Sequence, residues 1–184
     1  MSMYPDDAVY IAHQEASDTL EKRNDPNRPI PTVTFEDTYT LEVGNQRLEL
    51  AYYGPMHEPG NIFIYAPNQK VLMLIDVIFP GWTPFKDLAM AQDVPEFLAA
   101  HDKVLEYDFE TYIGGHLTRL GTPEDVQIQK EYMKYAVRFS KKLERCRQVL
   151  QKTSTMPPGF VFFLGFAAMG SALKRCWIKI DRQL

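Results

Sequence analysis

The segment from Tyr53 to Trp82, YGPMHEPGNIFIYAPNQKVLMLIDVIFPGW, constrains the fold more than any other part of the chain. It contains two apolar, strand-like runs, Asn61–Tyr65 and Val71–Ile75, which the turn residues 66–70 connect. Such runs must bury at least one face against other parts of the protein. The segment therefore predicts two neighbouring strands of a sheet, with loops before the first strand and after the second.

An aspartate, Asp76, lies in the apolar run VLMLIDVIF at the end of the second strand. A bare buried carboxylate there would cost on the order of several kcal/mol, so it must reach water, a basic side chain or a metal ion. His57 lies in the loop before the first strand, and His116 ends the short apolar run at residues 112–115. Two imidazoles and a carboxylate are the donor types of a metal shell. The alternative is an ion-paired aspartate with two surface histidines.

Composition is ordinary for a soluble globular domain. The chain has 184 residues, enough for one domain with a sizeable core, and 45% of them are hydrophobic and 24% charged. A formal net charge of −4 argues against a nucleic-acid partner, because neutralising phosphates requires a basic face. We therefore expect no nucleic-acid partner.

The two cysteines, Cys146 and Cys176, form no CxxC motif and indicate no disulfide framework. We expect two free thiols in a reducing compartment. The first ten residues contain neither a basic nor an apolar signal-peptide region. Together these observations predict a cytoplasmic location.

Residue patterns predict alternating strands and helices. Strands are expected at residues 8–12, 32–35, 39–43, 47–53 and 107–115, and helices at residues 16–23, 94–105 and 123–152. Asp93 and Thr122 are the expected N-caps of the last two helices, with Asp125 completing a variant capping box. His101 is expected on the surface of its helix. Because the last helix exceeds the usual length, a kink or break within it is left open.

The chain changes character near its C-terminus, so we predict a domain at residues 1–152 and an apolar tail at residues 153–184. The run Gly159–Leu173 is apolar without interruption. It is shorter than the ~20 residues that a membrane span needs. A buried or partner-covered helix is therefore favoured over the alternative, a membrane-associated tail.

Three motifs, in this order, resemble those of the metallo-β-lactamase superfamily over roughly residues 8–138. The residues that begin YGPMHEPG are similar to the family pattern GPxHTxGxxxVYxPxxKVLFxGDxxF, and ETYIGGHLTRLGTPEDV is similar to the later GGH loop. The resemblance implies an α/β fold, an αββα sandwich of two mixed sheets flanked by helices, here incomplete. It also implies a metal-dependent hydrolase with one or two zinc ions and a small-molecule substrate.

Carried over by position, the resemblance implies that His57 is the third-histidine ligand and that Asp76 bridges two metals. His116 matches the last histidine ligand, on the second metal. The family motif HxHxDH is absent from this chain. We therefore expect weak metal binding and a weakened or lost activity. The alternative is a pseudoenzyme or truncated fragment that acts through protein association, as a homo-oligomer or with a partner that covers exposed sheet.

The loop after Asp76 is aromatic and rich in proline. If the family geometry holds, Phe79 and Trp82 line the substrate mouth, and the alternative is that they plug the core. Arg119, just after His116, is a candidate for binding an anionic substrate group, although a solvated loop arginine is the favoured interpretation. In this superfamily the loops choose the substrate, so the sequence does not name it.

Overall fold

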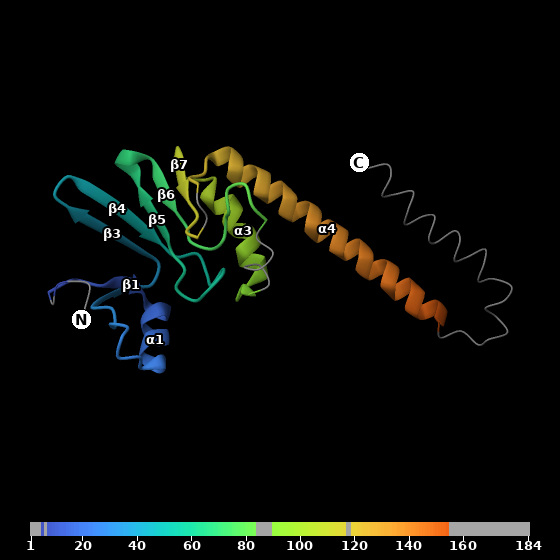
Figure 1. The fold of residues 1–184 in the computed structure, drawn as a ribbon, viewed down its shortest axis with the longest axis horizontal. Helices are drawn as coiled ribbons and strands as arrows, with labels where there is room; N and C mark the ends of the chain where they lie inside the picture. The colour runs from blue at the N-terminus through green and yellow to red at the C-terminus, as the bar shows by residue number, and fades with distance from the viewer. Residues whose placement is uncertain (1–4, 6, 84–89, 117–118, 155–184) are drawn as a thin grey trace. The chain divides into compact units, whose positions relative to one another are not determined.

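The computed structural model describes residues 5, 7–83, 90–116 and 119–154. The chain divides into two units, residues 1–133 and residues 134–184. The first unit contains all of the strands found in the described residues, and Figure 1 shows them as arrows. The predicted division after residue 152 stays a prediction, because the tail from residue 155 lies outside the described residues.

A five-stranded mixed sheet in the order β3-β4-β5-β6-β7 forms the centre of the first unit. The strands are β3 (Thr38–Val43), β4 (Gln46–Ala51), β5 (Phe63–Ala66), β6 (Val71–Met73) and β7 (Thr111–Ile113). Consecutive strands pair antiparallel from β3 to β6, whereas β7 pairs parallel to β6. The parallel pair brings the end of β7 to the same edge as the end of β6, which is where Asp76 follows.

A smaller parallel sheet pairs β1 (Ile11–His13) with β2 (Val33–Phe35), and α1 (Gln14–Arg23) connects them. His13 caps this helix, because its Nδ1 atom accepts from the Glu15 backbone N–H over 3.2 Å. Its ring stacks on Tyr52 with the ring centroids 3.6 Å apart. The two sheets and their helices confirm the predicted α/β class.

The core lies between the five-stranded sheet and the helices α3 (Val94–Val104) and α4 (Pro123–Ser154). Figure 1 shows α3 and the beginning of α4 near β6 and β7. The central side chains come from alternate positions of the strands and from one face of each helix: Phe63, Leu72, Tyr112, Phe97, Val104, Val126 and Met133. Period-2 strands and a 3.6-residue helix repeat account for this selection.

His101 corrects one prediction, since its side chain is fully buried rather than on the surface. Its Nε2 atom lies 3.0 Å from Nε2 of Gln129, and its Nδ1 atom lies 3.2 Å from the Leu98 carbonyl oxygen. The amide nitrogen of Gln129 can only donate, so the imidazole accepts at Nε2 and carries its proton on Nδ1. The position of His101 in its helix could not show that Gln129 of α4 would donate a hydrogen bond to it.

The predicted helix caps are confirmed. Asp93 accepts from the Glu96 backbone N–H over 3.0 Å. Thr122 and Asp125 form the reciprocal pair: the Thr122 N–H donates to Asp125 Oδ2 over 3.0 Å, and the Asp125 N–H donates to Thr122 Oγ1 over 3.4 Å. The helix that follows continues as α-helix to Ser154, so the break left open does not occur.

Cys146, on α4, is disulfide-bonded. The prediction of a free thiol at this position is therefore wrong. Cysteine usage then no longer supports a reducing compartment. Cys176 and the apolar run at residues 159–173 lie outside the described residues. Within the part of the chain that the structure describes, no helix combines the length and apolar character that crossing a membrane requires.

Candidate metal centre

Asp76 lies in the turn after β6 and has a φ of +63°, in the left-handed region. Residues other than glycine seldom adopt this conformation, although aspartate does so more readily than most. Its N–H donates to the Gly114 carbonyl oxygen over 3.2 Å, and the preceding Leu74 N–H donates to Ile113 over 3.1 Å. These two bonds extend the pairing of β6 with β7 past the strand ends and hold Asp76 beside the GGH loop.

The two glycines of that loop permit this close approach. A Cβ atom on Gly114 would lie 2.3 Å from the Ile78 carbonyl oxygen, and one on Gly115 would lie 2.9 Å from Cγ2 of Ile75. Beneath them, the hydroxyl of buried Tyr112 donates to the Leu74 carbonyl oxygen over 2.7 Å. Burial raises the pKa of this phenol well above its usual value, so it remains a donor.

His57 lies in the loop between β4 and β5 and is buried. Residues just ahead of α3 hold this loop, because the Gln92 N–H donates to the His57 carbonyl oxygen over 3.2 Å and Asp93 donates to Met56 over 3.3 Å. Asn61, later in the same loop, connects it to the residue before Asp76, because its side-chain amide donates to the Ile75 carbonyl oxygen over 2.9 Å. These contacts bring His57 Nε2 to 3.9 Å from Asp76 Oδ2.

His116 reaches the same carboxylate from the end of the GGH loop. Its Nδ1 atom lies 2.5 Å from Asp76 Oδ1, and its side chain is 76% exposed. The structure therefore brings together the three residues that the sequence singled out, with Asp76 between two imidazoles. The predicted alternative of an aspartate ion-paired with a basic side chain other than histidine finds no support among the contacts observed at Asp76.

These contacts are not those of a finished metal site. Within the described residues, no three side chains of His, Cys, Asp and Glu are placed to hold a metal ion together. Two ligands of one tetrahedral zinc, each about 2.0–2.1 Å from the metal, lie about 3.3 Å apart. The 3.9 Å between His57 and Asp76 is near this value, but the 2.5 Å between His116 and Asp76 is a short hydrogen bond instead. The donor types fit zinc, and a zinc ion held by all three residues would require exposed His116 to move.

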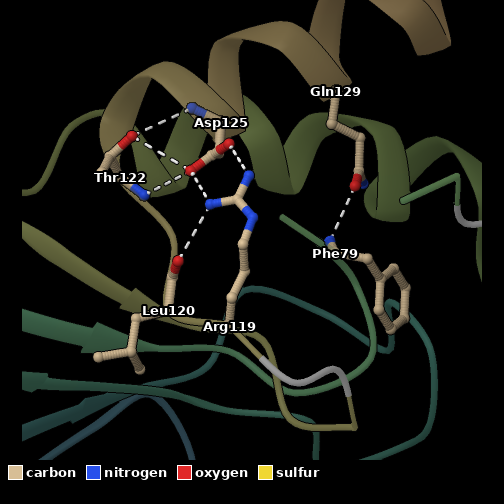
Figure 2. A network of polar contacts seen from close by, with 6 residues as sticks. All are labelled: Phe79, Arg119, Leu120, Thr122, Asp125 and Gln129. Carbon is tan, nitrogen blue, oxygen red and sulfur yellow. Dashed lines mark hydrogen bonds and ion pairs between the residues drawn. The ribbon is translucent and has the colours of Figure 1, made fainter. Parts of the chain in front are cut away.

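The three residues predicted to bind substrate occupy different surroundings. Phe79 is buried, and its backbone N–H donates to Gln129 over 2.8 Å, as Figure 2 shows. Trp82 is exposed. Arg119 makes a two-pronged ion pair with Asp125, with nitrogen–oxygen distances of 2.9 and 2.5 Å (Figure 2). This guanidinium lowers the pKa of the Asp125 carboxyl. A substrate-binding role for the three stays a prediction.

Gln129 is a residue that the sequence argument missed. Its amide oxygen accepts from Phe79, while its amide nitrogen donates to the Val77 carbonyl oxygen over 2.9 Å and contacts His101. The Gln129 side chain thus holds the backbone of residues 77–79, directly after Asp76. A glutamine on the apolar face of α4, between Val126 and Met133, was the available signal.

Comparisons with known proteins agree with this fold. The family model described as the metallo-beta-lactamase superfamily matches residues 2–116. The chain is 28% identical over 126 residues to the 2,4-dinitroanisole O-demethylase subunit alpha of Nocardioides sp. (strain JS1661), covering 65% of this chain and 36% of that protein.

Solved structures with a similar fold include a metallo-beta-lactamase from Pontibacter korlensis, with a TM-score of 0.57, 18% identity, and coverage of 67% of this chain and 58% of that one. The DIM-1 metallo-beta-lactamase gives a TM-score of 0.57 at 17% identity, covering 70% of this chain and 58% of the other. The chain thus spans about a third of the curated relative and somewhat over half of the solved structures. Its fold and its family match place this chain in the metallo-β-lactamase superfamily.

Proposed function

We propose that the chain belongs to a metal-dependent hydrolase, in which His57, Asp76 and His116 hold zinc. The observation that carries the proposal is the convergence of both imidazoles on one carboxylate, 3.9 and 2.5 Å from its two oxygens. The three residues come from three separate loops. A chance cluster of surface side chains would not explain why His57 is buried or why Asp76 adopts a left-handed conformation.

Each of these residues has a distinct role in the proposed zinc site. His57 is fixed by the loop contacts ahead of α3, so it presents Nε2 from a rigid support. Asp76 faces both imidazoles and can share its two oxygens between them. When bound, zinc supplies Lewis acidity that activates water and polarises a carbonyl or phosphoryl oxygen. Three protein donors leave one position of a tetrahedral ion for water.

The substrate class is an open choice among bonds that activated water can break. Esters, thioesters and lactams are the general candidates in such a fold. The 28%-identical relative is named for O-demethylation of 2,4-dinitroanisole, which adds aryl methyl ethers to the panel. That relative is also named as a subunit, so activity in this chain is to be measured with and without added partner chains.

The test is the zinc content of purified protein, measured by inductively coupled plasma mass spectrometry after zinc loading and desalting. We expect bound zinc in the parent chain and at least a tenfold weaker retention in His57→Ala, Asp76→Asn and His116→Ala. Glu58→Ala is the matched control, because Glu58 is exposed and adjacent to His57. Zinc retention that the three variants leave unchanged would overturn the proposal.

A second candidate function, association through the sheet, rests on a different observation. Directly paired positions place one apolar row across all five strands: Tyr39, Leu50, Ile64, Met73 and Ile113. This row lies on the face opposite Phe63 and Leu72, which pack toward the helices. All but Leu50 in the row are only partly buried. A second copy of the chain would cover this face.

A further inference from the structure

Helix α4 changes character after Met133. Its first part packs Val126 and Met133 into the core of the first unit. Residues 134–148, in the orange part of α4 in Figure 1, carry six basic side chains and one acidic side chain. Their net charge is +5, whereas the whole chain carries −4, so the remaining residues carry −9. Residues 134–148 are therefore a strongly basic segment of an acidic protein.

An apolar stripe runs along this basic segment. It consists of Tyr135, Phe139 and Leu143, whose spacing of four residues places them on one side of the helix. Their side chains are 53%, 41% and 54% exposed, and none of them belongs to the hydrophobic core of the described residues. An exposed apolar stripe on an otherwise polar helix indicates a contact surface. We name these three residues the apolar stripe.

Basic side chains border one edge of the apolar stripe. Arg138, Lys142 and Arg145 follow one another at spacings of four and three residues, so they form a second row beside it. Arg138 and Arg145 are exposed. The acidic residue of the segment, Glu144, pairs with Arg147 at 2.8 Å and leaves this row basic. The helix thus presents apolar surface and positive charge side by side.

This combination favours one class of partner. A second copy docked through the same face would bring together two segments of net charge +5, which repel each other. Nucleic-acid phosphates would match the charge but offer no apolar surface to the stripe. A bilayer with anionic headgroups offers negative charge and hydrocarbon in adjacent layers. We propose that residues 134–148 bind the surface of an anionic phospholipid membrane, with the apolar stripe inserted below the headgroups.

The helix lies parallel to the membrane surface in this arrangement. The apolar stripe extends about 12 Å from Tyr135 to Leu143, at 1.5 Å per residue. The long side chains of Arg138 and Lys142 keep their charged ends among the headgroup phosphates while their stems lie along the apolar boundary. Gln148 lies nine residues after Phe139, or two and a half turns, and therefore faces water from the opposite side of the helix.

The first test is sedimentation of the full chain with phospholipid vesicles. One set consists of phosphatidylcholine, and the other contains about one third phosphatidylglycerol. We expect binding to the anionic vesicles that is about tenfold tighter than to the neutral ones and that weakens at high salt. Equal binding to both sets would overturn the role of charge. Binding to neither would overturn the proposal and favour an acidic protein as the partner.

The second test removes one side chain of the apolar stripe. Leu143→Gln should weaken binding to the anionic vesicles about fivefold, because less apolar surface enters the membrane. Leu120→Gln is the matched control, since Leu120 is the same residue type, is 62% exposed and lies outside the segment. Circular dichroism checks that both variants remain folded. Unchanged binding of Leu143→Gln would show adsorption by charge alone and would overturn the insertion of the stripe.

The third test removes positive charge. The double variant Arg138→Gln with Arg145→Gln should lose about fivefold in binding to anionic vesicles for each charge removed. The control is Lys22→Gln with Arg23→Gln, which removes two exposed positive charges from α1. Equal losses in the two double variants would assign the effect to net charge and would overturn the proposed location of the contact.

The fourth test measures which side of the helix enters the membrane. Phe139→Trp and Gln148→Trp are each compared with the parent chain in anionic vesicles that contain brominated acyl chains, which quench tryptophan fluorescence at close range. We expect added quenching from Phe139→Trp and none from Gln148→Trp. Equal quenching from the two variants, or quenching from Gln148→Trp alone, would overturn the proposed orientation.

Discussion

Asp76 has a backbone φ of +63°, and its carboxylate contacts the imidazoles of His57 and His116. A left-handed aspartate persists only where its surroundings determine it, and the neighbouring Gly114 supplies this support through its carbonyl oxygen. The conformation of this one residue therefore determines whether the candidate metal site can form. Glycine at position 114 is needed for space, since its φ is not among the positive values.

Gly114→Ala should destabilise the protein by about 1–3 kcal/mol, because the new Cβ meets the Ile78 carbonyl oxygen and the backbone must shift. Urea unfolding measures the loss. Gly44→Ala is the comparison, since Gly44 has φ of +61° but nothing within 4 Å of an added Cβ. It should lose only about 1 kcal/mol from backbone conformation. Equal losses in both variants would argue against the steric reason.

His101 should make stability depend on pH. Burial lowers the pKa of this imidazole from its usual 6.5, so the unfolded chain binds its proton more readily than the folded chain. The contribution is complete above pH 6.5 and is lost progressively as the pH falls below that value toward the folded-state pKa. Urea midpoints between pH 5 and 8 should show this slope, and His101→Gln should reduce it. An unchanged slope in the variant would assign the effect to other groups.

At the scale of elements, the N-terminus of α3 has two roles. Asp93 caps the helix with its carboxylate, and its own N–H donates to Met56 beside His57. The helix start and the loop that presents the imidazole are therefore one connected structure. A change at the cap should reach the candidate metal site through the backbone.

Asp93→Ala should lose about 1 kcal/mol of stability, since the Glu96 N–H then lacks its acceptor. Asp93→Asn should retain most of the stability, because asparagine caps helices about as well. Chemical denaturation measures both variants, and zinc retention of the alanine variant reports on His57. A loss in the asparagine variant as large as in alanine would show that charge, rather than capping, matters here.

At the scale of the whole molecule, helices α3 and α4 pack on the face of the five-stranded sheet that carries Phe63 and Leu72. The row that includes Ile64 and Met73 on the other face is partly exposed. Apolar surface of this kind favours association.

The parent chain should therefore self-associate at micromolar concentrations, and Ile64→Lys should shift it toward monomer in sedimentation velocity. Thr40→Lys is the control, because Thr40 is exposed and alternation places it on the opposite face of β3. A stable monomer in the parent chain would exclude association through this face. A similar shift with Thr40→Lys would show that added charge alone is responsible.

The sequence alone determined the features that depend on neighbours a few residues away. Asp93 and Thr122 cap their helices as predicted because a cap is satisfied within three residues. The pairing of the two strands on either side of residues 66–70 could also be predicted, because a short turn joins two apolar runs.

Only the tertiary structure decided the rest. His116 contacts Asp76 from 40 residues away, and Gln129 buries His101 from 28 residues away. Arg119 pairs with Asp125, a contact that the sequence did not predict. Burial and hydrogen-bond partners at such separations depend on how strands and helices pack, and local sequence patterns carry no information about which polar groups that packing brings together.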